Sequence, residues 1–66
     1  MKFRERLKEL RKAKDMSQAA LSKATGISQS AIAKWELGRT EPTASAIVTL
    51  AKFFEESADY LLGIED

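Results

Sequence analysis

Apolar residues recur every three or four positions in five segments of the chain. That spacing places side chains on one face of a helix, whereas a strand buried on one face would alternate apolar and polar residues. No segment alternates in that way. The pattern therefore predicts an all-α fold of five short helices, at residues 3–13, 17–24, 28–37, 44–54 and 58–62.

The residues that flank these segments support the predicted helix ends. Serine and threonine cap a helix by accepting a hydrogen bond from a free backbone N–H, and glycine ends a helix by adopting a left-handed conformation. The predicted N-caps are Ser17, Ser28, Thr43 and Ser57, and the predicted stops are Gly26, Gly38 and Gly63. Only Gly26 and Ile27 separate the second helix from the cap of the third, so a tight turn is expected to fix how these two helices cross.

The inward side of each helix supplies the predicted core. Its members are Phe3, Leu7, Leu10, Leu21, Ile32, Trp35, Ile47, Leu50, Ala51, Phe54, Leu61 and Leu62. Val48 and Phe53 lie off the apolar stripe of their helix, and we expect them to be partly exposed. A chain of 66 residues that is 44% hydrophobic is expected to form one domain over residues 1–66.

The residue types that are missing from the chain narrow the possible function classes. There is no cysteine and no histidine, so the two commonest metal-ligating side chains and the commonest general base are absent. A chain this short also has little material with which to build a walled pocket. We therefore expect no enzymatic activity, no metal site and no cofactor.

The hydropathy of the chain bears on where the protein is located. No apolar run approaches the roughly 20 residues that span a bilayer. The N-terminal segment is charged and amphipathic, unlike the apolar block of a signal peptide. We therefore expect a cytoplasmic protein with no membrane partner.

Charge is unevenly distributed along the sequence, although the net charge is only +1. Residues 1–14 carry seven basic and two acidic side chains, and residues 55–66 carry five acidic side chains and no basic one. If the first helix lies beside the third, one face of the protein would attract phosphate while the C-terminal end would repel it. The alternative is that the first helix is merely solvated by mixed charge.

The outward side of the third helix is the best candidate for a binding surface. It carries Gln29, Ser30, Ala33, Lys34 and Leu37. None of these residues is acidic, glutamine and lysine can hydrogen-bond to base edges or phosphate, and alanine can contact a thymine methyl group. The composition of this face is also that of an ordinary solvated helix surface, and the residues alone leave both interpretations open.

Several segments together resemble the phage repressor and Cro (XRE-like) family of helix-turn-helix DNA-binding domains. These segments are RLKELRKAKDMSQAALSKATGIS, AIAKWELGRTEP and LAKFFEESADYLLG. The shared anchors are Arg11, Ser17, Gln18, Gly26, Trp35, Glu36, Gly38, Pro42 and residues 59–63. The resemblance covers the chain from Phe3 to Gly63 and implies a lambda-repressor-like domain of five helices. It also implies transcriptional control through operator binding, often as a dimer.

The resemblance assigns expected roles to single residues. Gln29, Ser30 and Lys34 match positions that reach base edges in the major groove, and Ala33 matches a neighbour on the same face. The residues expected to meet the DNA backbone are Ser17, Gln18, Ser28, Arg39 and Thr40. Arg11 and Glu36 match a pair that forms a structural salt bridge between the first helix and the end of the third.

Four residues depart from the family pattern. Leu37 stands where a polar residue is common, Glu41 where a basic one is frequent, and Glu55 and Glu56 replace a usual glycine and a usual apolar residue. Because Glu55 and Glu56 depart from the pattern, the sequence does not determine the geometry of the turn before the fifth helix. The candidate dimer residues are Val48, Phe53, Ala58 and Tyr60, for which simple packing within one chain is the alternative.

We therefore predict a sequence-specific regulator of transcription, most simply a repressor. It would bind a double-stranded operator as a homodimer, with half-sites about 34 Å apart and the third helix in the major groove. Such a protein would be prokaryotic or phage-encoded and associated with the nucleoid when bound. The alternative is an antitoxin-like or adaptor protein whose main role is to bind a partner protein, which the acidic C-terminal end and exposed apolar residues favour.

Overall fold

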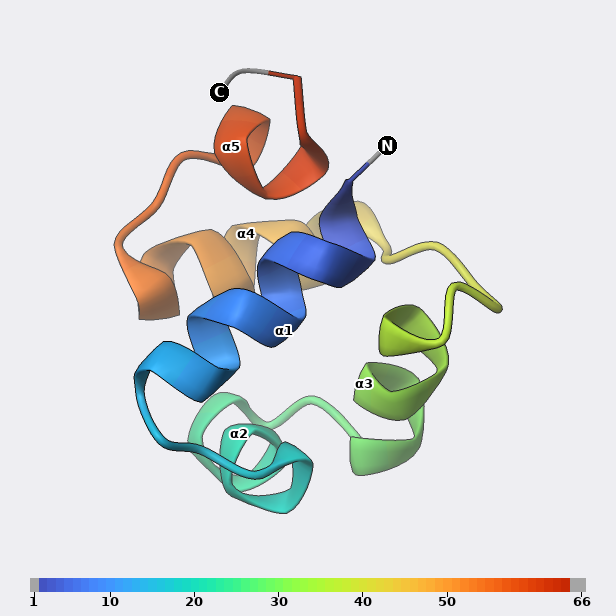
Figure 1. Cartoon of the computed structure of the whole chain (residues 1–66), viewed down its shortest axis with the longest axis vertical. Helices are drawn as coiled ribbons and strands as arrows, with labels where there is room; N and C mark the ends of the chain where they lie inside the picture. Colours follow the sequence, from blue (N-terminus) through green and yellow to red (C-terminus); the bar gives the residue numbers. More distant parts are fainter. Residues whose placement is uncertain (1, 65–66) are drawn as a thin grey trace.

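Five helices make up the fold in the computed structural model, which describes residues 2–64 (Figure 1). They are α1 (Phe3–Ala13), α2 (Gln18–Thr25), α3 (Gln29–Glu36), α4 (Ala44–Phe54) and α5 (Ala58–Leu62). The described residues contain no strand, so the predicted all-α fold is confirmed. Glu65 and Asp66, which contribute to the acidic C-terminal charge, lie outside the described residues.

The predicted bounds differ from the observed ones only at α2 and α3. Ser17 and Ser28 are N-caps rather than first helical residues, and Leu37 is the C-cap of α3. Their backbone angles explain this, because the two serines are extended and cannot belong to the helix that they cap. As predicted, the Oγ atoms of the four caps accept hydrogen bonds from backbone N–H groups three residues further on.

The helix α1 crosses the middle of the molecule and contacts both α3 and α5 (Figure 1). The helix-turn-helix pair of α2 and α3 packs below it in this view, while α5 lies at the opposite end. The helix α4 lies behind α1 and contacts α5 and α2. Because α1 lies beside α3, some of its basic side chains come close to the candidate binding surface.

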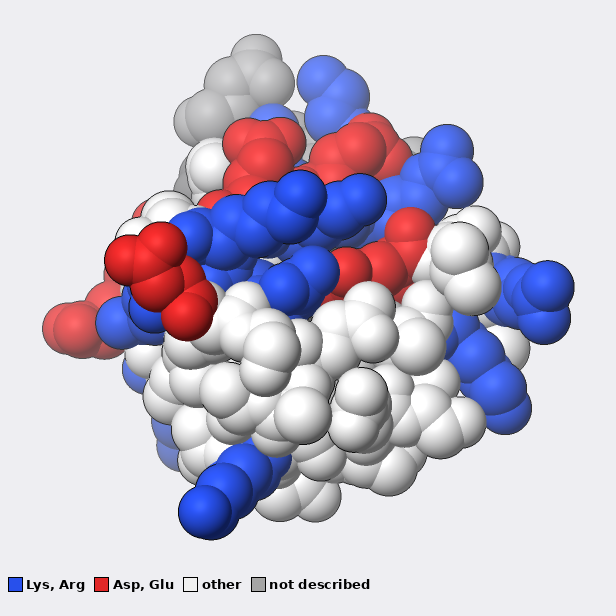
Figure 2. All heavy atoms as spheres, turned by 60° about the horizontal axis from the view of Figure 1, so that its bottom comes forward, with Lys and Arg blue, Asp and Glu red and all other residues white. Residues whose placement is uncertain are grey.

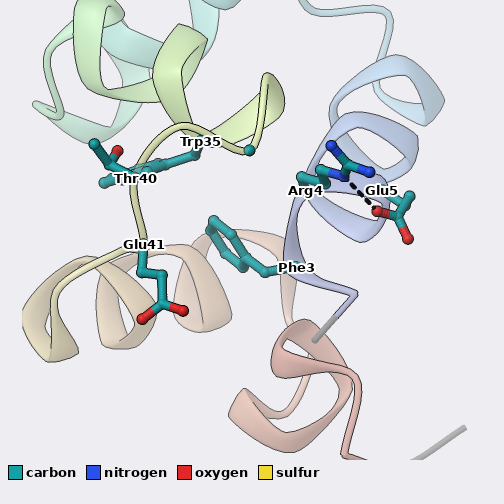
Figure 3. A pocket seen from close by; sticks show the side chains of 7 residues that line it. Phe3, Arg4, Glu5, Trp35, Thr40 and Glu41 are labelled. Carbon is teal, nitrogen blue, oxygen red and sulfur yellow. Dashed lines mark hydrogen bonds and ion pairs between the residues drawn. The ribbon is translucent and has the colours of Figure 1, made fainter.

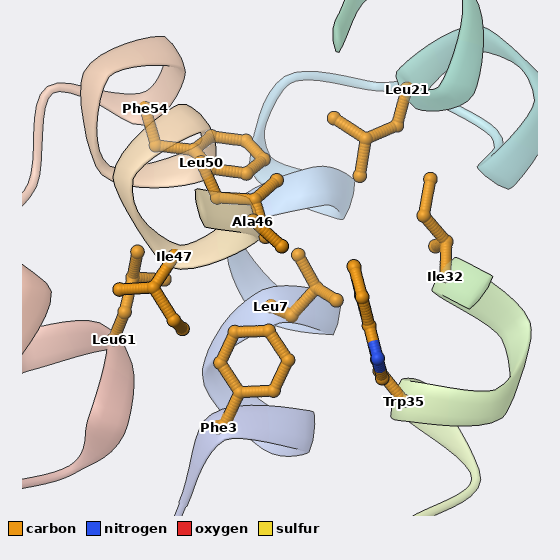
Figure 4. Close-up of a cluster of buried hydrophobic side chains, with 10 residues drawn as sticks. All are labelled: Phe3, Leu7, Leu21, Ile32, Trp35, Ala46, Ile47, Leu50, Phe54 and Leu61. Carbon is orange, nitrogen blue, oxygen red and sulfur yellow. The ribbon is translucent and has the colours of Figure 1, made fainter. Parts of the chain in front are cut away.

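Side chains from all five helices meet in one buried cluster (Figure 4). The buried members are Phe3, Leu7, Leu21, Ile32, Trp35, Ala46, Ile47, Leu50, Phe54 and Leu61. The rings of Phe3 and Trp35 meet edge to face with centroids 5.8 Å apart, which packs α3 directly against α1. This contact helps to hold the third helix at a defined position on the scaffold.

The observed core differs from the predicted one at its margin. Leu10, Ala51 and Leu62 are only partly buried, because they pack around the edge of the cluster rather than inside it. Ala46 is buried although it was not part of the predicted stripe, since its small side chain gives little hydrophobic signal. Val48 is exposed and Phe53 is partly buried, as expected.

The turn between α4 and α5 keeps a left-handed C-cap although it has no glycine. Glu55 occupies the cap with φ 56° and ψ 42°, and the N–H of Glu56 donates to the carbonyl of Ala51 at 3.0 Å. Glu55 therefore occupies a conformation that costs a residue with a Cβ atom roughly 1–2 kcal/mol. The replacement of the usual glycine preserves the turn but strains it.

We expect Glu55→Gly to raise the free energy of unfolding by about 0.5–1 kcal/mol. Relief of the left-handed strain and loss of a negative charge at a helix C-terminus outweigh the greater flexibility of glycine in the unfolded chain. Denaturant unfolding measures the difference. Glu56→Gly is the matched control and should not stabilise, because Glu56 has no positive φ; equal effects of the two variants would remove strain as the cause.

Candidate nucleic-acid interface

The turn between α2 and α3 is held by a compact set of hydrogen bonds. Gly26 has φ 77°, and its N–H donates to the carbonyl of Ser22 at 2.8 Å. The hydroxyl of Ser22 donates to the carbonyl of Ile27, and the N–H of Ile27 donates to Oγ1 of Thr25 at 3.3 Å. Side chains of α2 thus fix the entry into α3, and this role of Ser22 and Thr25 was not predicted from the sequence.

The ion pair predicted between Arg11 and Glu36 forms in the structure, across α1 and α3. Nε of Arg11 donates to Oε2 of Glu36 at 2.8 Å, and Nη2 donates to Oε1 at 2.9 Å. The two side chains are only 10% and 6% exposed. This parallel two-bond geometry is the most directional form of the arginine–carboxylate contact, so it defines the distance and angle between the two helices.

Two further hydrogen bonds attach the start of α2 to this ion pair. Nη1 of Arg11 donates to the carbonyl of Met16 at 2.8 Å, just before the α2 cap. Nε2 of Gln18 donates to Oε1 of Glu36 at 3.1 Å. We call Arg11, Glu36 and Gln18 the buried polar cluster; it joins the start of α2 to the end of α3 through α1.

The ionisation of Glu36 depends on its partners. Burial alone would raise the pKa of its carboxyl, but hydrogen bonds from Arg11 and Gln18 outweigh burial and hold the pKa below its usual value. The positive charges of Arg11 and Lys8 act in the same direction. The hydrogen bond to Glu36 in turn raises the pKa of the Arg11 guanidinium, against the opposing effect of burial. Both groups are therefore charged near neutral pH.

We expect the cluster to make the fold sensitive to acid. Because the pKa of Glu36 is lower in the folded than in the unfolded chain, the cluster stabilises the fold above the unfolded value of about 4.3. That contribution is lost as the pH falls through the folded pKa. Glu36→Gln removes the titration, so its thermal midpoint should fall less than that of the wild type between about pH 6 and pH 2. Circular dichroism measures the thermal midpoints. An equal fall in the midpoints of the variant and the wild type would contradict this role.

The predicted base-contacting residues lie along the outer side of α3. Gln29, Ser30 and Lys34 are exposed, and Ala33 is partly buried. Ser17 and Ser28 are exposed caps, while Gln18 is partly buried because of its bond to Glu36. The first turns of α2 and α3 contain no acidic residue, so neither helix start repels an anion.

Arg39 and Thr40 lie in the loop that follows α3, and both are exposed. The N–H of Arg39 donates to the carbonyl of Lys34 at 2.9 Å, and Gly38 has φ 75°, so the chain turns sharply away from α3 at this point. Figure 2 views the molecule from the side of α2 and α3 and shows a broad uncharged surface. Basic side chains lie at several places along its edges, and acidic side chains lie beside it at the upper left and upper right. An uncharged centre with basic side chains at several places along its edges can lie over a DNA groove that is flanked by two phosphate chains.

Two of the four candidate dimer residues lie on different sides of α4. Val48 and Phe53 are five positions apart on α4 and therefore about 140° apart around its axis. Phe53 packs on Phe54 with ring centroids 5.0 Å apart, and the ring of Tyr60 lies 4.1 Å from the guanidinium carbon of Arg6. Val48 and Ala58 are exposed, so these two are more open to a second chain than the partly buried Phe53 and Tyr60.

An open pocket of about 410 Å³ lies between the start of α1 and the loop after α3 (Figure 3). Its lining residues are Phe3, Arg4, Glu5, Trp35, Gly38, Thr40 and Glu41. Arg4 and Glu5 form an exposed ion pair of 3.0 Å at its edge. The described residues hold no group of three or more potential metal ligands, and no described helix is long and apolar enough to cross a membrane.

Comparison with known proteins identifies the domain. A helix-turn-helix family model matches residues 7–61. Repressor protein C2 of Salmonella phage P22 is 43% identical over 58 residues, which are 88% of this chain and 27% of that protein. The HTH-type transcriptional activator BcrR of Enterococcus faecalis is 36% identical over the whole chain and 32% of its own length. The phage CTXphi transcriptional repressor RstR of Vibrio cholerae is 40% identical over 96% of this chain and 56% of its own length.

The chain spans between about a quarter and just over half of the length of these relatives. No solved structure matches the chain significantly. The family model covers the helix-turn-helix, the buried polar cluster and most of the core. The chain therefore belongs to the phage repressor and Cro type of the helix-turn-helix family, which is a family of DNA-binding regulators of transcription and not of enzymes.

Proposed function

We propose that this domain reads a double-stranded operator by inserting α3 into the major groove. The observation that carries the proposal is the buried polar cluster, which holds the acid-free outer side of α3 beside the start of α2. A helix that reads base edges must be held rigidly, because hydrogen bonds to bases depend on distance and angle. Two of the relatives are named as repressors and one as an activator; we favour repression by occupation of the operator.

Base reading is assigned to the exposed side chains of α3. Gln29 lies in the first turn, and a glutamine amide can both donate to and accept from an adenine edge. Lys34 lies more than one turn further along and can donate to guanine. Ser30 and Ala33 complete the surface. The hydroxyl of Ser30 can hydrogen-bond to an adenine or a guanine edge, and the methyl group of Ala33 can contact the methyl group of thymine.

Backbone binding is assigned to the two helix starts and the loop after α3. Ser17, Gln18 and Ser28 lie where free backbone N–H groups and the positive end of a helix dipole attract phosphate. Arg39 and Thr40 lie beyond the other end of α3 and suit the opposite strand. These contacts would position the domain on DNA without reading its sequence.

Arg39→Ala should weaken binding to every sequence alike and reduce the slope of log affinity against log salt by about one unit. The reason is that one phosphate contact releases about one counterion. Fluorescence anisotropy on a specific and a scrambled duplex at several salt concentrations measures this. Lys52→Ala, on the outward side of α4, is the matched control; an unchanged slope for Arg39→Ala would remove this residue from the phosphate contacts.

A homodimer on two half-sites completes the proposal. The longest dimension of one chain is 28 Å, so two copies fit side by side on half-sites about 34 Å apart without overlapping. Sedimentation of the protein with duplexes that hold one or two half-sites tests this. We expect two chains to bind the duplex with two half-sites and one chain to bind the duplex with a single half-site. If only one chain binds to each kind of duplex, the protein does not bind its operator as a dimer.

A protein-binding role is the second candidate. Leu37 and Val48 are 63% and 51% exposed. Exposed apolar side chains are often covered by a partner where they join into one contiguous patch. An adaptor or antitoxin-like protein would bind its partner tightly and retain no duplex at low salt. Retention of duplex DNA in the absence of any other protein would argue against this alternative.

A further inference from the structure

The basic residues of α1 occupy a defined part of its circumference. At about 100° per residue, Phe3, Leu7 and Leu10 face the core. Arg11 lies at the border of that sector, and the exposed residues Arg4, Lys8 and Lys12 follow it around the helix. Glu5 and Glu9 lie further around the helix, past Lys12. We call Arg4, Lys8 and Lys12 the α1 basic face.

Two members of the α1 basic face, Arg4 and Lys8, lie on the side of α1 that is directed at α2 and α3. Lys12 lies further around the helix, on the side opposite the core. Arg11, on its border, reaches Glu36 at 2.8 Å. Lys8 lies close enough to Glu36 for its charge to stabilise the carboxylate. Arg4 lies beside the end of α3, because a Cβ atom added to Gly38 would be only 2.8 Å from its Nη1 atom.

The opposite side of α1 has a different role. Nη1 of Arg6 donates to the carbonyl of Tyr60 at 3.0 Å, and the guanidinium group lies over the Tyr60 ring. Arg6 therefore holds α5 against α1. Figure 2 shows a row of basic side chains behind the uncharged surface of α2 and α3, with acidic side chains between the row and this surface in places. Positive charge from α1 is thus concentrated beside the candidate DNA-binding surface, on the same side as the start of α2.

We infer that the α1 basic face is a further phosphate-binding surface, which extends the backbone contacts of α2 along one DNA strand. The inference rests on the proposed DNA binding. Lysine and arginine neutralise phosphates and release counterions, so this surface would add affinity and salt dependence without reading bases. It would compensate for Glu41, which places a negative charge in the loop after α3.

The test is the salt dependence of binding by Lys8→Gln, Lys12→Gln and the double variant, with Lys52→Gln as the matched control on α4. Each single variant is expected to reduce the slope of log affinity against log salt by about 0.9, and the double variant by about twice that amount. The ratio of affinities for the preferred and a scrambled duplex should stay unchanged. Lys52→Gln should leave both quantities as in the wild type.

Three results would overturn the inference. Slopes equal to the wild type in both single variants would show that α1 does not meet phosphate. A changed affinity ratio would show that α1 acts by moving α3 rather than by contacting the backbone. An equal drop in slope for Lys52→Gln would show that only the net charge matters. Should Lys8→Gln be unstable because of its proximity to Glu36, Lys12→Gln still decides the question.

The failure of this inference can be distinguished from that of the proposed function. A wild-type chain that retains no duplex at any salt concentration would refute the DNA-binding function itself. A wild-type chain that binds with a measurable slope, together with variants that match it, would refute only the role of the α1 basic face.

Discussion

Replacing Arg11 with methionine is expected to lower the free energy of unfolding by about 3–5 kcal/mol. Glu36 would keep its buried position with a 6% exposed side chain but would lose two charge-assisted hydrogen bonds. The carbonyl of Met16 would lose its donor as well. A chain of this length has a total stability of roughly 3–10 kcal/mol, so the variant would lose at least about a third of it.

Denaturant unfolding, with circular dichroism as the readout, measures this loss. The control is the double variant Arg11→Met/Glu36→Leu, which removes both charges and should regain most of the lost stability, because no buried charge is left unpaired. If the single variant unfolds at the same denaturant concentration as the wild type, the ion pair does not stabilise the fold. If the double variant is no more stable than the single one, the loss comes from packing rather than from the stranded charge.

Gln29→Ala should weaken binding to the preferred operator by about 1–3 kcal/mol, or roughly 5–150-fold. The side chain is exposed in the first turn of α3 and makes no hydrogen bond that helps to hold the fold, so stability should not change. The loss should be confined to duplexes that carry the preferred base at one position. Relaxed preference at that position, measured by competition with all four base pairs, is the expected signature.

Gln18→Ala is the matched comparison, since it removes the only other glutamine of the chain. Its amide bonds to Glu36 and lies at the start of α2, so we expect losses of similar size on every duplex. Uniform losses for Gln29→Ala would place this residue among the backbone contacts. A base-specific loss for Gln18→Ala would reverse the two assignments.

Local sequence signals were sufficient to predict the helices. The apolar period, the four serine and threonine caps and the glycines after α2 and α5 each act within a few residues, so they can be recognised without knowledge of the fold. The partial burial of Leu10 and the full burial of Ala46 depend on where neighbouring helices pass. Periodicity within one helix cannot provide that information.

The buried polar cluster illustrates a second limit. A hydropathy pattern places a charged residue such as Arg11 on the surface. Only the resemblance of Arg11 to an anchor of the family indicated that it pairs with Glu36, 25 positions away. The bond from Gln18 to Glu36 and the position of Lys8 beside them were not predicted. They arise from the packing of α1 against α3, a tertiary contact that leaves no periodic trace in the sequence.

The turn before α5 was left open by the sequence because Glu55 is a poor left-handed residue. The structure keeps the left-handed cap, since the surrounding hydrogen bonds determine it more strongly than the preference of one side chain. The dimer residues remain a prediction. Phe53 and Tyr60 already contact other side chains of the same chain, which limits the surface that they offer.

Selection from a randomised duplex pool at two salt concentrations tests the proposed operator reading most directly. The purified protein is incubated with the pool, and the retained duplexes are sequenced. We predict a palindromic motif whose half-site centres lie about 34 Å apart, enriched at both salt concentrations. Weak retention that falls steeply with salt and enriches no sequence would contradict operator reading and leave only non-specific binding to phosphate.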